Sequence, residues 1–227
     1  MSSAQTPTAE GKQSAARRVL EDSVSRRKFM ALTGGAGSLS VLIAACGDDD
    51  SDTTSTSSTT ASDDAIAQFG EGDIGIVNYA LTLEYLEAAF YEEVAKSGLF
   101  SGDDLALIQK FGDTENQHVV ALTSTVKELG GKPAPKPKTQ FELKNARSVL
   151  KTAADVENLG AAAYLGQAGA IQSPQVLAAA LSIHTVEGRH AATLNTLTNQ
   201  PITPDGAFAK PADAQTVLDS VQPFIVS

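Results

Sequence analysis

Apolar side chains recur at steps of three and four residues along most of the chain after residue 72. Ile76, Ala80 and Leu83 begin one such series, which continues to Val94. Side chains at this spacing share one face of an α-helix, so the pattern predicts amphipathic helices rather than strands. Gly, Pro and Ser interrupt the pattern, and the predicted helices cover about 73–96, 101–129, 141–169 and 173–197. A tail follows, with a short amphipathic stretch at 212–221.

The connections between the predicted helices are unequal. A few residues join the first helix to the second and the third to the fourth, so each pair should be antiparallel. Ser101 and Ser173-Pro174 are suited to begin the second and fourth helices. Residues 130–140 alternate Pro and Lys, which favours an extended chain of about 3.1 Å per residue. This segment could form the long crossover of a four-helix bundle, while a plain linker between two hairpins is the alternative.

The first fifty residues have the pattern of a targeting segment. Residues 25–30, which include Arg26 and Arg27, resemble a twin-arginine export signal. A weakly apolar stretch at 31–45 ends at Cys46, and residues 42–47 look like a lipobox, in which this cysteine is lipidated. A chance buried thiol is the alternative for Cys46. The domains expected are a signal peptide at 1–45, a disordered Asp/Ser/Thr tether at 46–70, a helical bundle at 71–199 and a tail at 200–227.

Charge narrows the range of partners. The formal net charge is −10, and removal of residues 1–45 leaves 11 basic and 24 acidic residues, a net charge of −13. Nucleic-acid binding needs clustered Lys and Arg, so a nucleic-acid partner is not expected. A single cysteine excludes an internal disulfide. The expected location is the outer face of the cytoplasmic membrane, in the cell envelope, held by a lipid anchor.

An internal repeat carries the most specific signal. Residues 84–91 and 157–164 both fit Glu-x-Leu-x-Ala-Ala-x-Tyr, in the first and third predicted helices. The second and fourth helices each carry a Glu-x-x-His pair. The halves also agree in spacing, since 31 residues separate Glu84 from Glu115 and 30 separate Glu157 from Glu187. Each half therefore offers a glutamate on one helix and a Glu-x-x-His pair on the next.

Helical geometry gives this spacing a chemical meaning. Residues three apart project from nearly the same face, so a Glu and a His at this spacing can bind one ion together. All of these residues lie near the middle of their predicted helices, where they could meet. Glu and His on amphipathic helices commonly face water, but four carboxylates meeting in one core would be hard to explain without a metal. Carboxylate and imidazole ligands suit iron or manganese.

With this arrangement the chain resembles the ferritin-like di-metal carboxylate proteins, which include bacterioferritin, rubrerythrin, manganese catalase and the exported desiccation-related proteins. The resemblance covers residues 73–197 and implies an all-α, ferritin-like four-helix bundle with a long crossover between helices two and three. It also implies two iron or manganese ions, with Glu115 and Glu187 as bridges. The six ligands implied are Glu84, Glu115, His118, Glu157, Glu187 and His190.

Several neighbouring residues leave alternatives open. Glu87 could replace Glu84, although the repeat places Glu87 opposite Gly160. His184 shares a face with Glu187 and is either a hydrogen-bonding partner of a ligand or a surface residue. Tyr91 and Tyr164 each lie seven residues after a predicted ligand, where they either pack in the core or donate a hydrogen bond to a ligand.

The function implied is an oxidase, peroxidase or catalase-like reaction with oxygen or peroxide. The sequence has no rubredoxin-like cysteine module, and both Met residues lie in the signal, which argues against rubrerythrin-type electron transfer and Met-ligated haem. A non-enzymatic protein that sequesters metal, or protects the cell during desiccation or envelope stress, is the alternative. Formation of a homo-oligomer stays open.

The lipid anchor can be tested in cells. Cys46→Ala removes the only thiol that could be lipidated, so the domain should leave the membrane fraction or remain unprocessed. Cell fractionation followed by immunoblotting measures this, with Ser51→Ala in the adjacent tether as the control. A Cys46→Ala protein that fractionates like the parent would show that no lipid at this residue holds the domain.

Overall fold

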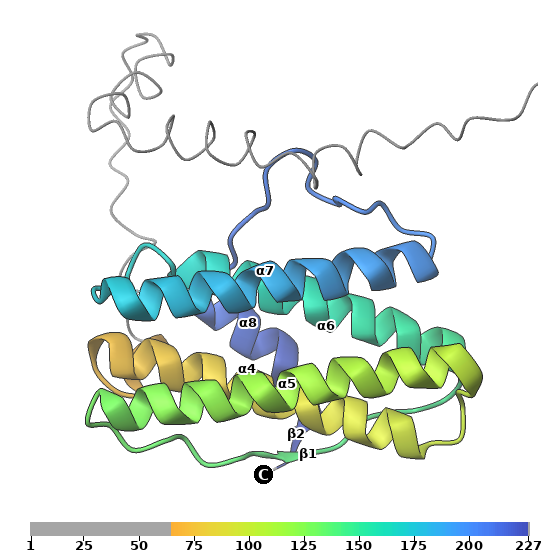
Figure 1. Cartoon of the computed structure of the whole chain (residues 1–227), viewed down its shortest axis with the longest axis horizontal. Coiled ribbons are helices and arrows are strands. Elements are labelled where there is room, and N and C mark those ends of the chain that lie inside the picture. Colours follow the sequence, from red (N-terminus) through yellow and green to blue (C-terminus); the bar gives the residue numbers. More distant parts are fainter. Residues whose placement is uncertain (1–64, 227) are drawn as a thin grey trace, which may run out of the picture. The chain divides into compact units, whose positions relative to one another are not determined.

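The computed structural model describes residues 65–226, in which four long helices pack side by side (Figure 1). The predicted all-α, ferritin-like bundle is confirmed. The expected signal, with Arg26 and Arg27, and the expected lipidation residue Cys46 lie outside the described residues. The long helices are α4 (Gly72–Lys96), α5 (Gly102–Glu128), α6 (Ala146–Gln167) and α7 (Pro174–Leu197).

The two antiparallel pairs α4/α5 and α6/α7 are closed by short turns. Gly98 has φ of +74°, a conformation that favours glycine, in the turn between α4 and α5. Ser173 caps α7 as expected, because its hydroxyl accepts a hydrogen bond from the Val176 amide at 3.3 Å. Ser101 precedes α5, but its side chain makes no capping hydrogen bond.

The third long helix begins later than the sequence pattern predicts. The expected start was Phe141, whereas α6 starts at Ala146 after Asn145, whose side chain accepts a hydrogen bond from the Ser148 amide. Phe141 and Leu143 are part-buried and alternate with exposed neighbours, which is the period of an extended chain. Apolar residues at 141 and 143 therefore belong to the end of the crossover and not to the helix.

The segment between α5 and α6 is a crossover and not a plain linker. It runs along the bundle from one end to the other (Figure 1), and it contains β1 (Lys138–Thr139). Buried Asn78 on α4 holds it in place, since its amide nitrogen donates to the Lys132 carbonyl at 3.1 Å and its amide oxygen accepts from the Ala134 amide at 2.8 Å.

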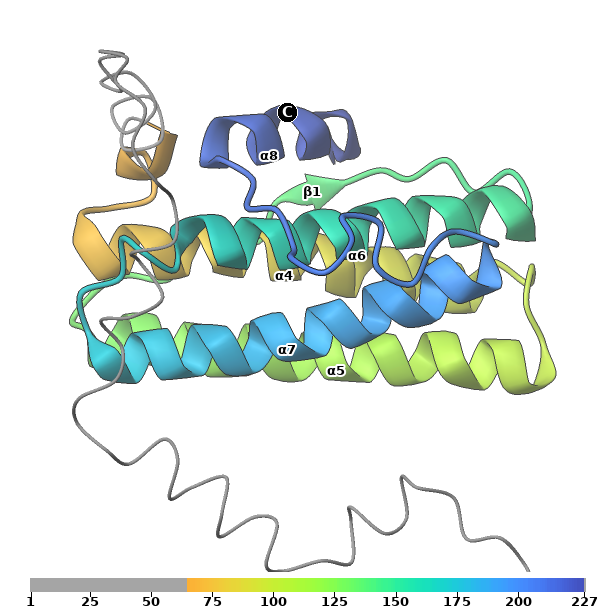
Figure 2. The ribbon, with the colours of Figure 1, turned by 90° about the horizontal axis from the view of Figure 1, so that it is seen from above.

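The C-terminal tail covers one side of the bundle. Residues 201–213 lead to α8 (Ala214–Val221), the 3₁₀ turn Gln222–Phe224 and β2 (Ile225–Val226). The short strand β2 pairs antiparallel with β1, with Lys138 opposite Val226. Ala214, Val217 and Val221 of α8 pack into a cluster with apolar residues of α4 and α6. Figure 2 shows α8 on the α4/α6 side, away from α5 and α7.

The interior is divided along the bundle into apolar clusters. Phe90, Phe111 and Leu194 belong to a cluster at one end, and Val77, Leu122 and Val176 belong to another at the opposite end. The middle of the bundle holds buried charged side chains instead. Within residues 65–226, every helix is either too short or too polar to span a membrane.

Two helical glycines offer a matched test of the tail packing. A Cβ at Gly166 on α6 would lie 1.9 Å from the Ala212 carbonyl oxygen, whereas a Cβ at Gly188 on α7 would meet nothing within 4 Å. Gly166→Ala should therefore push the tail from α6 and lower the free energy of unfolding by about 1–3 kcal/mol. Gly188→Ala should raise it by about 0.5–1 kcal/mol, because alanine restricts the unfolded chain. Denaturant titration measures both, and equal effects would show that the tail is not packed closely here.

Candidate metal centre

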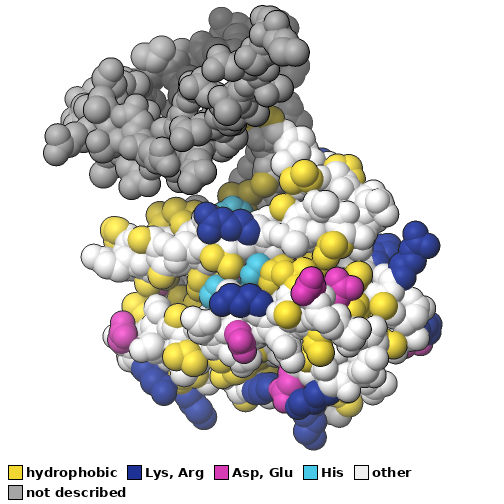
Figure 3. Space-filling view, turned by 45° about the vertical axis from the view of Figure 1, so that its right-hand side comes forward, with side chains coloured by type: hydrophobic (Ala, Val, Ile, Leu, Met, Phe, Trp, Pro, Cys, Tyr) yellow, Lys and Arg dark blue, Asp and Glu magenta, His cyan; other side chains and the backbone are white. Residues whose placement is uncertain are grey.

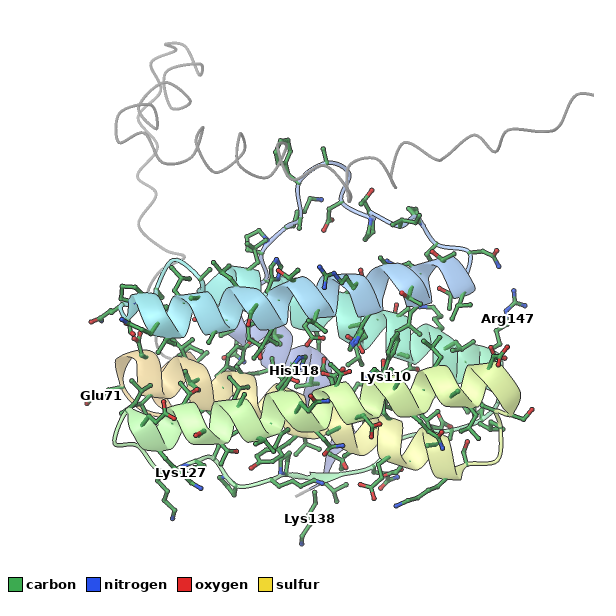
Figure 4. The ribbon with its side chains drawn as sticks, in the orientation of Figure 1. Glu71, Lys110, His118, Lys127, Lys138 and Arg147 are labelled. Atoms are coloured by element: carbon green, nitrogen blue, oxygen red, sulfur yellow. The ribbon has the colours of Figure 1, made fainter. Side chains whose placement is uncertain are left out.

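Six side chains from the middle of the four long helices meet in the bundle core. All four glutamates have no exposed surface, and both histidines are less than a tenth exposed. His118 lies at the middle of the bundle in Figure 4. These are the six residues expected from the repeat: Glu84 on α4, Glu115 and His118 on α5, Glu157 on α6, and Glu187 and His190 on α7.

The six side chains form two overlapping groups. In each group four side-chain atoms suited to metal binding lie within 4.8 Å of one another. Both groups contain Glu115 and Glu187. Glu84 and His118 complete one group, and Glu157 and His190 complete the other, so the two groups are related as the two halves of the repeat are.

Each histidine presents its Nδ1 atom to carboxylates from several helices. His118 Nδ1 lies 2.8 Å from Glu115 Oε2, 3.0 Å from Glu187 Oε1 and 3.2 Å from Glu84 Oε2. It therefore contacts one oxygen each from α5, α7 and α4. His190 Nδ1 lies 2.8 Å from Glu115 Oε1 and 3.3 Å from Glu157 Oε2.

Several of these buried atoms lack a hydrogen bond despite their close neighbours. Glu115 Oε1, Glu157 Oε2, both Glu187 oxygens and His190 Nδ1 have no hydrogen-bond partner among the described residues. A buried polar atom without a partner is costly, by about 1–3 kcal/mol. His190 Nδ1 and Glu115 Oε1 are 2.8 Å apart, yet their orientation does not make a hydrogen bond. These atoms therefore lie close together in the two groups without all being joined by hydrogen bonds.

The spacing of the atoms fits a metal. Two ligands bound at about 2.1 Å and at right angles lie about 3.0 Å apart, as around an octahedral ion. The separations between His118 Nδ1 and its three carboxylate oxygens, 2.8 to 3.2 Å, fall around this value. Oxygen and imidazole donors are also those that iron and manganese accept. The buried carboxylate and histidine groups are therefore compatible with a di-metal site.

Two tyrosines hold the outer glutamates from the opposite half of the repeat. The Tyr91 hydroxyl on α4 donates to Glu157 Oε1 on α6 at 2.5 Å. The Tyr164 hydroxyl on α6 donates to Glu84 Oε1 on α4 at 2.6 Å. Of the two alternatives for these tyrosines, the structure therefore shows the hydrogen bond to a glutamate. Each bond leaves the second oxygen of its glutamate free to face the histidines.

Phe111 contacts the site, although no motif in the sequence singles it out. Its ring stacks on His190, with centroids 4.1 Å apart and an interplanar angle of 25°. This contact fixes the plane of the imidazole. A buried aromatic residue one helical turn before Glu115 on α5 has no feature in the sequence that would link it to a histidine on α7.

Glu87 is a fifth buried carboxylate and lies outside both groups. It reaches toward α6, where a Cβ at Gly160 would lie 2.8 Å from Glu87 Oε1. The space around it is lined by apolar residues of α4, α6 and α8, which include Leu83, Val156 and Val217. Gly160 thus leaves room for a side chain that the other half of the repeat does not have.

His184 lies apart from the six. Its Nδ1 donates to the Ala161 carbonyl at 3.0 Å, and the side chain is part-buried on α7. It lines a groove beneath the 201–211 segment together with Lys210. No hydrogen bond or ion pair joins His184 to the glutamates of the centre in the described part of the chain, so the surface alternative fits its position.

Burial and close charges shift the pKa values of the centre. Burial, with the nearby charges of Glu187 and Glu115, raises the pKa of Glu84 to about 8. Burial likewise raises the pKa of Glu157 well above its ordinary value. Burial opposes protonation of His118 and His190, but their contacts with carboxylates outweigh it and raise their pKa values to about 12 and about 10. Burial would raise the pKa of Glu115, but its close contacts with the imidazole groups of His118 and His190 lower it overall.

A bundle of four helices with a long crossover between the second and third, and a central cluster of buried Glu and His, defines the ferritin-like class of proteins. The family model for the ferritin-like domain matches residues 72–200, and the chain belongs to this family. No curated protein matches the chain.

Protonation of the centre predicts how the metal-free protein responds to pH. Glu84 and the two histidines have raised pKa values in the folded state, so their stabilising effect is complete below the unfolded values of 4.5 and 6.5 and is lost as pH rises. The melting temperature of metal-free protein should therefore fall from about pH 5 to about pH 9. Glu84→Gln should flatten this fall between about pH 5 and pH 8, and exposed Glu142→Gln should leave it unchanged. A melting temperature that rises over this range would contradict the protonated centre.

Proposed function

We propose that this protein holds two iron or manganese ions in the bundle core and reacts with oxygen or peroxide. The observation that carries the proposal is the sharing of Glu115 and Glu187 by two groups of four candidate ligands. Glu84 and His118 would hold one ion, and Glu157 and His190 the other, with the shared carboxylates as bridges. Bound iron or manganese would supply one-electron redox chemistry and Lewis acidity.

The chain's own residues would prepare this site. Tyr91 and Tyr164 orient the outer carboxylates, and Phe111 orients His190. Both histidines must give up the Nδ1 proton to bind metal, so metal affinity should rise with pH. The imidazole side chains retain about a tenth of their exposed surface, and Figure 3 shows histidine at the molecular surface. Solvent and small polar molecules would therefore approach the centre past the exposed edges of His118 on α5 and His190 on α7.

We also propose that the domain works outside the cytoplasm, tethered by a lipid on Cys46. The support is the sequence of the first fifty residues. Proteins exported through twin-arginine signals cross the membrane folded, so the metal would be loaded in the cytoplasm. Loading there would avoid competition from copper and zinc, which bind most sites more tightly than iron or manganese.

Metal titration of the purified protein tests the centre. The wild type should bind two equivalents of Mn²⁺ or Fe²⁺, measured by calorimetry and elemental analysis, and should melt at a higher temperature when loaded. His118→Ala should weaken one ion more than the other, because His118 belongs to one group only. Glu115→Gln should weaken both. The matched controls His184→Ala and exposed Glu93→Gln should bind like the wild type.

The oxidant assays separate the enzyme from the alternative. Loaded protein that consumes oxygen or peroxide, with loss of activity in Glu115→Gln, would support the enzyme. Two equivalents bound with no turnover of either oxidant would instead favour a metal-sequestering protein. One equivalent or none, with no change in melting, would show that the cluster is not a di-metal site.

A further inference from the structure

An apolar cavity of about 30 Å³ lies inside the bundle beside the candidate centre. Its lining comes from all four long helices, and it includes Leu83, Leu122 and Tyr164. The Tyr164 hydroxyl is bonded to Glu84, so one side chain separates the cavity from the centre. Thr125 and Ala179, which are part-exposed, also line it and place its outer end near the surface between α5 and α7.

The cavity exists because one half of the repeat has small residues where the other half has large ones. The seventh position of the matching octapeptides is Phe90 in the first and Ala163 in the second. Two turns before the Glu of each Glu-x-x-His pair, Leu107-Ile108 is replaced by Ala179-Ala180. Ala163, Ala179 and Ala180 line the cavity, whereas Phe90 and Ile108 fill the core at the other end of the bundle.

Most of the lining is apolar, and two of its polar groups are already engaged in hydrogen bonds. The Tyr164 hydroxyl donates to Glu84, and the Thr125 hydroxyl donates to the Ala121 carbonyl. Tyr79 and Gln167 also line the cavity, and the buried Tyr79 hydroxyl has no hydrogen-bond partner among the described residues. Hydrogen peroxide has two donors and several acceptors, and their burial here would leave most of them unpaired. A diatomic molecule without hydrogen-bond donors gives up no strong hydrogen bonds to water when it enters the cavity.

We propose that this cavity receives dioxygen and delivers it to the Tyr164 side of the centre. The inference rests on the proposed function and specifies the route of each oxidant. Dioxygen reaches the centre through the apolar cavity, whereas peroxide must pass the exposed edges of the His118 and His190 rings between α5 and α7. The volume suits one or two small molecules, since about 10–15 Å³ measured in this way is enough to hold one water.

Xenon is a probe of the cavity that does not depend on metal or activity. Crystals of metal-free protein under xenon pressure should show one xenon atom against Ala163 and Ala180. Ala180→Ile, which copies Ile108 of the other half, should abolish this site. Exposed Ala178→Ile on the same helix is the matched control and should keep it. Xenon bound elsewhere, or unaffected by Ala180→Ile, would overturn the proposal.

Rapid mixing of iron(II)-loaded protein with each oxidant then tests delivery. Extra methylene groups in an apolar pocket change a rate by about tenfold or more, so Ala180→Ile should slow oxidation by dioxygen by about that factor. Oxidation by hydrogen peroxide, and both rates in Ala178→Ile, should stay within about twofold of the wild type. If Ala180→Ile lowers the melting temperature strongly, Ala179→Leu, which also fills the cavity, is used in its place. Equal slowing of both oxidants, or of neither, would overturn the proposal.

The outcomes also separate this inference from the proposed function. If Ala180→Ile binds metal normally and its iron is oxidised by dioxygen at the wild-type rate, the cavity does not deliver dioxygen, but the proposed metal centre still stands. Failure of the wild type to react with either oxidant would remove the proposed reaction, while xenon at Ala163 and Ala180 would still support a site for a small apolar molecule.

Discussion

Four glutamate side chains share one buried space in this protein, and the surrounding structure depends on how their charge is balanced. Taking an ionised carboxylate out of water is costly unless a partner compensates it. Without a cation, the compensation comes from protons: the histidines are held protonated, and the pKa of Glu84 is raised by burial and by its neighbours. A divalent ion in the same place would replace those protons with fixed charge. Both carboxylate oxygens of Glu187 still lack a hydrogen-bond partner among the described residues.

The fold supplies the rigidity that such a centre needs. Each carboxylate comes from a different helix, so the four helices must keep one relative position. Two hydrogen bonds join the halves of the repeat: Tyr91 on α4 donates to Glu157 on α6, and Tyr164 on α6 donates to Glu84 on α4. Hydrogen bonds from the Asn78 side chain attach the crossover to α4, and the pairing of β2 with β1 attaches the tail to the crossover on the same side of the bundle. The α5/α7 side, where the histidine edges lie, carries no such cover among residues 65–226 (Figure 2).

The sequence predicted the four helices and the six central residues because both follow from spacing along the chain. Helical periodicity located the helices to within a few residues, except at Phe141, where two part-buried apolar residues in an extended segment resemble the start of a helix. The repeat singled out the six because equivalent residues in two hairpins come together by symmetry. The stacking of Phe111 on His190 could not be predicted, since it depends on how α5 packs against α7. For the same reason spacing left open whether the tyrosines bond to glutamates, and to which half.

The repeat keeps the glutamates, histidines and tyrosines in both halves, whereas several apolar positions differ between the halves, and this difference has a physical basis. Two ions held by shared carboxylates would need equivalent ligands on both sides, and a change in either shared glutamate, Glu115 or Glu187, would disturb both halves. Apolar positions have no such coupling, and each end of the bundle can pack independently. One end is filled by Phe90 and Ile108, and the other keeps a cavity next to Ala163 and Ala180. The two halves also differ at a polar position: the first half has Glu87 where the second half has Gly160, so only one half provides this carboxylate. A centre with symmetric ligands can therefore stand in asymmetric surroundings, and under the proposal those surroundings would decide from which side a small molecule reaches it.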